Sequence, residues 1–274
     1  MSFFSGFKKN KDNSGINTKE QLNKASAVLE KSLSDGPLSS SSAPLGEEHT
    51  FKQTCPVCGA TIVHTGRQLY EVSNNNQSAK KKFLDEGRKC FMSHCPKCGL
   101  DVLFAYPVQY IDTEEKLNIY LMPVGHPEEN EFFDNIFRYD TRPGFTTRLV
   151  ADVDALMDKI RVFEVGLDDR VVEICKVLKW GDLCEEKPKY ANAVCYSQWF
   201  LPSENDKEHV NYLAYGYEIN GKTDSIIIEL SSDFYEGVKK FFASTFYNMK
   251  LGLFEEVNKA WAYEAIDCLK QQKK

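Results

Sequence analysis

The pattern of hydrophobic and polar residues changes along the chain and divides it into parts. In residues 50–125, short runs rich in β-branched and aromatic residues are separated by turn residues, which predicts several short strands. One stretch within them, residues 78–87, offers Phe83 and Leu84 to a core and ends on a glycine. This part of the chain is therefore predicted to be a β-rich region with one inserted helix.

Residues 126–148 show no clean periodicity and are predicted to be a partly packed connector. Apolar residues at helical spacing then predict two consecutive helices, over residues 153–163 and 171–178. Asp168 and Asp169 precede the second helix. They could form an acid/base pair, but at a helix start they are more simply a cap and a partner of the helix dipole.

Three β-prone runs follow from Ala193 onward, and Asn220-Gly221 between the last two is typical of a tight hairpin turn. The pattern then predicts two amphipathic helices, over residues 232–250 and 254–271. Their aromatic stripe is interpreted as core rather than as a cofactor site.

The first 48 residues differ from the rest. A capping-box pattern from Thr18 to Gln21 begins a narrow apolar stripe at helical spacing, and a Ser-, Pro- and Gly-rich linker follows. Such a segment is either a disordered tail or a helix that orders on a partner.

The chain is thus predicted to be an α+β protein in three parts. Residues 1–48 are a flexible segment with one short amphipathic helix, residues 49–125 are the β-rich region, and residues 126–274 are an α+β body. The body is predicted to contain a helical hairpin and then a small antiparallel sheet with two C-terminal helices.

Composition adds that the protein buries a real core, since 42% of its 274 residues are hydrophobic and 12% are aromatic. No apolar run is long enough to span a bilayer, and the first residues do not have the order of a secretory signal. We therefore expect a cytoplasmic protein, while the sequence leaves its oligomeric state undetermined.

Charge is distributed unevenly. Residues 51–110 contain eight basic and four acidic side chains, whereas residues 111–274 contain twenty and thirty. An acidic bulk repels phosphate backbones, so nucleic acid is an unfavourable partner unless the basic side chains of the β-rich region form a local patch. A solvated surface is the simpler interpretation of these basic residues, which are Arg67, Lys80, Lys81, Lys82, Arg88, Lys89 and Lys97.

The strongest chemical signal is a Cys-Pro-x-Cys-Gly motif that occurs twice, with Cys55 and Cys58 in the first copy and Cys95 and Cys98 in the second. Two thiolates separated by two residues reach one ion from a tight turn, and a second such turn completes a sulfur tetrahedron. This pattern predicts a structural zinc site, although four thiolates also suit iron. Two separate redox motifs or a disulfide are the other interpretations, but neither pair has the βαβ context of a thioredoxin-like site.

Three further side chains lie near the motifs in sequence, namely His64, Cys90 and His94. They are either spare ligands or groups that hydrogen-bond around the site, because four sulfurs already satisfy a tetrahedral ion. The other cysteines are interpreted as small buried hydrophobes. Those residues are Cys175, Cys184, Cys195 and Cys268.

The motifs resemble the CpXC domain family, a bacterial and archaeal group similar to zinc ribbons. The resemblance rests on TCPVCG at 54–59, HCPKCG at 94–99, FLDEG between them and PVQYIDTEEKLNIYLMP after them, and it extends over roughly residues 50–180. It implies a metal-binding module at the four motif cysteines and implies no activity. Cys90 is a departure from the pattern, because it adds a fifth sulfur near the site.

The leading functional hypothesis is a scaffold or protein-interaction module stapled by structural zinc, since no catalytic motif is recognisable. The alternative is an enzyme or small-ligand-binding protein with a pocket in the body, near Tyr196, Trp199, Tyr212 and Tyr215. Nucleic-acid binding by a basic face of the β-rich region is a third hypothesis, which would require steep salt dependence.

Overall fold

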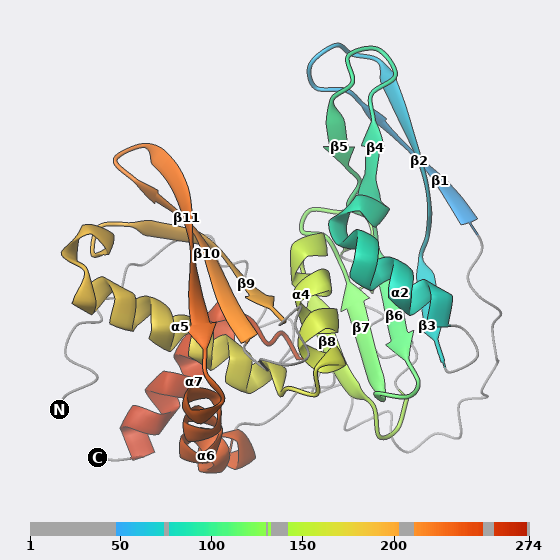
Figure 1. The fold of residues 1–274 in the computed structure, drawn as a ribbon. Coiled ribbons are helices and arrows are strands. Elements are labelled where there is room, and N and C mark those ends of the chain that lie inside the picture. Colours follow the sequence, from blue (N-terminus) through green and yellow to red (C-terminus); the bar gives the residue numbers. More distant parts are fainter. Residues whose placement is uncertain are drawn as a thin grey trace.

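The computed structural model describes residues 48–73, 77–129, 131–132, 142–202, 211–248 and 255–272. The predicted N-terminal helix and linker lie outside these residues. The described part is a mixed α+β fold with two β-rich ends, which confirms the predicted α+β class (Figure 1).

Two β-hairpins project together from one end of the molecule (Figure 1). The first pairs β1 (Glu48–Thr54) with β2 (Thr61–Arg67), and the second pairs β4 (Met92–His94) with β5 (Asp101–Leu103). Both hairpins are antiparallel, and each turns at one of the cysteine motifs.

The hairpins stand on a four-stranded mixed sheet in the order β3-β6-β7-β8. Its strands are β3 (Leu69–Val72), β6 (Val108–Asp112), β7 (Leu117–Leu121) and β8 (Thr146–Val150). The helical elements that pack near this sheet are α2 (Gln77–Glu86), the 3-10 turn η1 (Gly87–Phe91) and α4 (Val153–Glu164). The inserted helix predicted for residues 78–87 is therefore present as α2.

The sheet continues past residue 125, where the sequence predicts the β-rich region to end. β8 lies in the predicted body, yet it pairs in parallel with β7, and Leu117 is opposite Thr146. Whether the chain divides into two folding units at residue 125 stays a prediction. Residues 146–148, expected to belong to an irregular connector, are instead strand, because β7 offers them an open edge.

The second half of the described chain forms a three-stranded antiparallel sheet with three helices. Its elements are α5 (Asp169–Glu186), the 3-10 turn η3 (Pro188–Tyr190), β9 (Val194–Leu201), β10 (Asn211–Ile219), β11 (Lys222–Leu230), α6 (Ser232–Asn248) and α7 (Lys259–Gln272). The β10–β11 turn has φ of 52° at Asn220 and 75° at Gly221, as a turn with two left-handed residues requires. This confirms the predicted hairpin.

The start of the last helix differs from the prediction. A helix was expected from residue 254, whereas α7 begins at Lys259. Glu255 instead makes a parallel bridge to Arg148, and its carbonyl accepts from the amide of Leu149 at 3.2 Å. Asn258 then caps the helix, because its side-chain oxygen accepts from the amide of Trp261. Because Glu255 pairs with β8, the helix begins only at Lys259.

Two apolar clusters fill the molecule, and α4 lies between them. Leu156 and Ile160 of α4 pack into the cluster under the hairpins and the mixed sheet. Val162 packs into the other cluster, which holds α5 and the three-stranded sheet. The aromatic residues of the last two helices largely belong to this second cluster, as predicted, although Phe241 and Tyr263 are exposed.

A buried ion-pair network joins the two halves at α4. Arg148 on β8 makes two hydrogen bonds to Asp169 at 2.8 and 2.9 Å, and Lys159 on α4 pairs with Glu173 at 3.0 Å. Lys176 donates to Asp158 at 2.6 Å and to Glu173 at 2.9 Å. The seven members of this network are all buried: Arg148, Asp158, Lys159, Asp169, Glu173, Lys176 and Glu255.

The two aspartates take the predicted places at the start of α5, as a cap and as an acidic residue in the first turn, but Asp169 also belongs to the buried network. Asp168 caps α5 by accepting from the amide of Arg170 at 3.0 Å. Asp169 is 1% exposed and pairs with Arg148 and Lys159. Burial alone would raise the pKa of Asp169, but the charge of Lys159 and the hydrogen bonds and charge of Arg148 outweigh burial and lower the pKa to about 2.

We predict that Asp169→Asn lowers the free energy of unfolding by about 3 to 5 kcal/mol at neutral pH, because two buried cations lose their shared carboxylate. Since the folded pKa is depressed, the contribution of the charged form is present above pH 4. It is lost as the pH falls towards about 2. Denaturant unfolding at several pH values should therefore show the difference between parent and variant shrinking across that window.

The matched control is Asp267→Asn on the exposed side of α7, where the carboxylate pairs only with Lys270 among the contacts described. It should change stability by less than about 0.5 kcal/mol at every pH. A parent-to-Asp169→Asn difference that stays constant from pH 7 to pH 2 would contradict the network's role.

Candidate metal centre

The two cysteine motifs fold into matching turns. In the first, the amide of Cys55 donates to the carbonyl of Ala60 at 2.8 Å, and the amide of Gly59 donates to the carbonyl of Cys55 at 3.0 Å. In the second, the corresponding bonds from Cys95 and Gly99 measure 2.8 and 2.9 Å. The glycines have φ of 71° and 72°, which the left-handed bend after each second cysteine requires.

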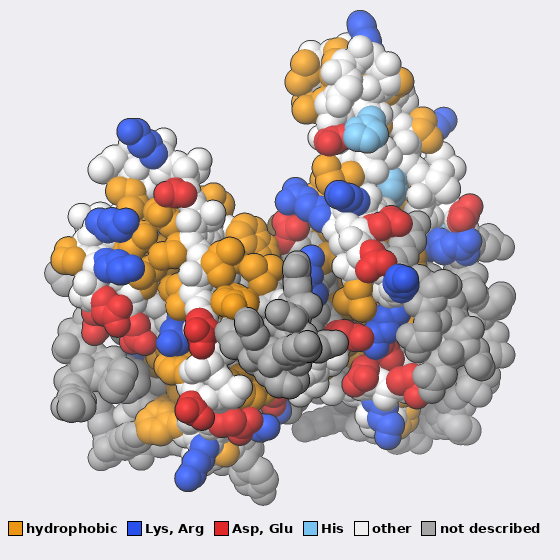
Figure 2. All heavy atoms as spheres, in the orientation of Figure 1, with side chains coloured by type: hydrophobic (Ala, Val, Ile, Leu, Met, Phe, Trp, Pro, Cys, Tyr) orange, Lys and Arg blue, Asp and Glu red, His pale blue; other side chains and the backbone are white. Residues whose placement is uncertain are grey.

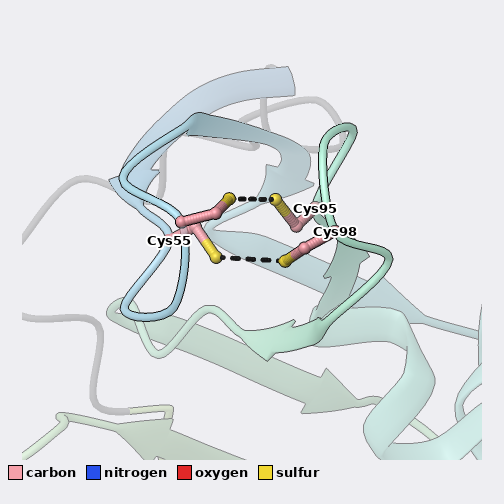
Figure 3. A group of neighbouring side chains, drawn as sticks. Cys55, Cys95 and Cys98 are labelled. Carbon is pink, nitrogen blue, oxygen red and sulfur yellow. Dashed lines mark hydrogen bonds between the residues drawn. The ribbon is translucent and has the colours of Figure 1, made fainter.

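These turns bring the four predicted sulfurs together, and Figure 3 shows the side chains pointing toward one another. All four Sγ atoms lie within 4.8 Å of one another. The Sγ atoms of Cys55 and Cys98 are 3.6 Å apart, and those of Cys58 and Cys95 are 3.4 Å apart. The pairs connect one turn to the other, so the cluster closes across the two hairpins.

The cluster fits a metal ion by its dimensions and donor set. Four sulfurs at about 2.3 Å from a zinc ion form a tetrahedron with edges of about 3.8 Å. The Cys55–Cys98 and Cys58–Cys95 sulfur separations are slightly shorter than that edge. A four-sulfur set of this size suits zinc or iron, and it leaves no coordination position for water.

The thiols differ in acidity within the cluster. For Cys95, a hydrogen bond from the backbone amide of Cys98 outweighs desolvation and lowers the pKa to about 6. For Cys58, a backbone hydrogen bond from Ala60 lowers the pKa, but desolvation and the neighbouring thiols together raise it to about 12. A divalent cation among the sulfurs would stabilise all four as thiolates.

The three neighbouring candidates do not join the cluster. His64 is buried, with its ring nitrogens 3.1 Å from the Ser93 hydroxyl and 3.5 Å from the Tyr106 hydroxyl. His94 faces outward and pairs with Asp101. Cys90 lies near the Glu86 carboxylate, with 3.7 Å between the sulfur and Oε2. The structure therefore gives Cys90 no place among the four clustered sulfurs.

Three of the seven residues of the predicted basic face form ion pairs. Lys80 is 11% exposed at its side chain and pairs with Asp112 at 3.0 Å and with Glu164 at 2.5 Å, so its interpretation as solvated is wrong. Arg67 pairs with Glu48 and Arg88 pairs with Asp154. Sequence reasoning missed these partners because they come from distant segments.

The four aromatic residues proposed to line one pocket lie in different surroundings in the structure. Tyr196 and Trp199 line a cavity beside α4, whereas Tyr215 is fully buried in the apolar cluster, with its hydroxyl bonded to the carbonyl of Lys176. Tyr212 is not among the cavity's lining residues. Among the helices described, none is both long and apolar enough to cross a membrane.

We predict that Gly99→Ala destabilises the protein by about 1 to 2 kcal/mol, because alanine is strained at a φ of 72° although nothing lies within 4 Å of the added Cβ. Thermal unfolding and the metal content of the purified variant measure the effect. Gly237→Ala is the control, since Gly237 lies inside α6 with equal space and its replacement should stabilise by about 0.5 to 1 kcal/mol. Equal melting of Gly99→Ala and the parent would show that the bend is not required.

Comparison with known proteins adds one finding. The family model described as "CpXC protein" matches residues 53–176, which contain all four clustered cysteines together with the mixed sheet, α4 and the first turns of α5. No curated protein and no solved structure matches the chain. Residues 53–176 of this chain therefore match the CpXC family, as their two Cys-Pro-x-Cys turns had indicated.

Proposed function

We propose that this protein is a zinc-stabilised interaction module, in which Cys55, Cys58, Cys95 and Cys98 bind one structural zinc ion. The observation that carries the proposal is the closed group of four sulfurs within 4.8 Å of one another. With four thiolate ligands, zinc has no open position at which to activate water, so its role is to hold the zinc-ribbon-like hairpins together.

The hairpins need such a staple because their own elements are small. β4 and β5 have three residues each, and the outward residues of β1 and β2 are exposed. A two-stranded hairpin is only marginally stable in water. Metal binding would therefore contribute directly to the folding of this end of the molecule.

A reducing compartment such as the cytoplasm fits this proposal. All nine cysteines of the chain are free thiols, and thiolate ligands must stay reduced to bind zinc. We propose a cytoplasmic location on this ground.

The surface offered to a partner is proposed to lie at the knuckle tip, defined here by Val57, Val63 and Leu100. Val57 is 71% exposed and Val63 is 51% exposed, and Figure 2 shows hydrophobic side chains at the end of the projecting hairpins. Val57 lies inside the first cysteine motif and Leu100 directly follows the second, so the metal would fix their positions. An apolar tip held rigid by zinc suits contact with a protein.

The zinc part of the proposal is tested by Cys55→Ser and Cys98→Ser, each of which removes one ligand. We expect the parent to contain one zinc per chain by elemental analysis. Both variants should lose the metal and show faster amide hydrogen exchange in residues 50–125.

Cys90→Ser is the control, because Cys90 lies near the motif in sequence but outside the sulfur cluster. It should keep the zinc and the parent's exchange pattern. Retention of zinc and of the parent's melting temperature in both Cys55→Ser and Cys98→Ser would refute the structural role.

The interaction part is tested by quantitative affinity purification from the native host with the double variant Val57→Asp and Leu100→Asp. We expect a protein that the parent retains to be lost with this variant while its zinc content is unchanged. Val124→Asp replaces another exposed valine, 62% exposed, away from the motifs and should retain the partner. The same proteins recovered with all three forms would exclude the knuckle tip as the contact.

A further inference from the structure

A cavity of about 360 Å³ lies where the two halves of the fold meet. Its walls come from the turn between β8 and α4, the first turns of α4, part of α5, residues 195–199 of β9 and residues 256–259 before α7. In Figure 1 this is the region where α4 faces β9. Its volume is within the usual range of small-molecule sites. None of its lining residues belongs to the cysteine turns.

The cavity lining includes part of the buried ion-pair network. Asp158, Lys159, Glu173 and Lys176 all line it, and both lysines are already paired. Asp158 also accepts from the amide of Phe200 at 2.5 Å, which fixes β9 against α4. The lysines are therefore poor partners for an added anion.

The rest of the polar lining is predominantly acidic. Asp152, Asp154 and Glu256 add three carboxylates, and Lys259 adds one cation, so the full lining contains five carboxylates and three lysines. Asp154 forms an ion pair with Arg88 at 3.0 Å, and Glu256 accepts a hydrogen bond from the Asn258 side chain at 3.4 Å. With Arg88 counted, five carboxylates face four cations, and the remaining negative charge makes the cavity attractive to a cation.

An irregularity in the second sheet gives the cavity an aromatic wall. The register between β9 and β10 shifts at Gly216 and Tyr217, which leaves Tyr196 as the extra residue of a bulge. A Cβ at Gly216 would lie 2.3 Å from the Ser197 hydroxyl and 2.9 Å from the Tyr196 ring. Only glycine at position 216 therefore leaves room for the Tyr196 ring beside β10.

Tyr196 and Trp199 both line the cavity, and Tyr196 is 59% exposed. Electron-rich rings beside carboxylates are the combination that attracts organic cations. The adjoining side chains carry unused hydrogen-bonding capacity as well. Within the described residues, buried oxygens of Ser197 and Gln198 have no hydrogen-bond partner.

We propose that this cavity is a binding site for a small organic cation, of the class of aliphatic amines and guanidines. The cationic head would contact the carboxylates of Glu256 and Asp154, and the carbon chain would pack beside Tyr196 and Trp199. The site shares none of its lining residues with the four cysteines, so it is independent of the proposed zinc function.

The acidity of the two carboxylates agrees with this geometry. Burial raises the pKa of Glu256, and the hydrogen bond from Asn258 only partly opposes it. Burial also raises the pKa of Asp154, although the charge of Arg88 lowers it. Both groups would gain from a cation that compensates for their lost hydration.

The test is calorimetric titration of the purified full chain with putrescine and agmatine, and with succinate as an anion of similar length. We expect both amines to bind with an affinity that falls as salt is added, and succinate not to bind. Tryptophan fluorescence should change on binding, because Trp199 lines the cavity. Glu256→Gln and Asp154→Asn should each weaken amine binding about tenfold.

Asp182→Asn is the matched control. Asp182 is also a carboxylate whose pKa is raised by burial, but it lines a different groove, between α5 and α6. This variant should bind the amines as the parent does. The proposal is overturned if neither amine binds at millimolar concentration, if succinate binds as tightly as the amines, or if Glu256→Gln and Asp154→Asn bind like the parent while remaining folded.

Discussion

Three buried cations and four buried carboxylates lie where the two apolar clusters meet, and the arrangement of the two halves depends on their pairing. A buried ion pair contributes little net stability over apolar packing, but the loss of one partner is costly. The pairs therefore act as a constraint. The bidentate contact of Arg148 with Asp169 fixes β8 against α5, and the contact of Asp158 with the amide of Phe200 fixes β9 against α4.

The same constraint explains why an open cavity persists at this junction. Apolar side chains would collapse together, whereas Asp158, Lys159, Glu173 and Lys176 must keep the directions that their hydrogen bonds require. The network fixes the spacing of α4, α5 and β9 by polar contacts, and the cavity lies beside these contacts. A site built on helices and strands in this way is already organised before a ligand arrives.

The sequence predicted what is local and missed what is distant. The cysteine turns, the Asn220-Gly221 hairpin and the amphipathic helices follow from residues close together in the chain. The pairing of Lys80 with Glu164 joins residues from α2 and α4, and the late start of α7 depends on Glu255 reaching β8. Charged residues inside otherwise apolar helices, such as Asp158 and Lys159, were the available signal for the network, but their partners could not be assigned from spacing alone.

The proposed metal site and the cavity are related through α4 without sharing a residue. Cys55 and Cys95 belong to the same apolar cluster as Leu156 and Ile160 of α4, whereas Asp158 of the same helix points into the ion-pair network. Loss of the metal would loosen the apolar cluster that packs on one side of α4. The charged side chains of α4 would still be held by their partners on α5. Under the two proposals, the hairpin end would depend on a metal while the cavity depends on buried ion pairs, and each would respond to its own ligand.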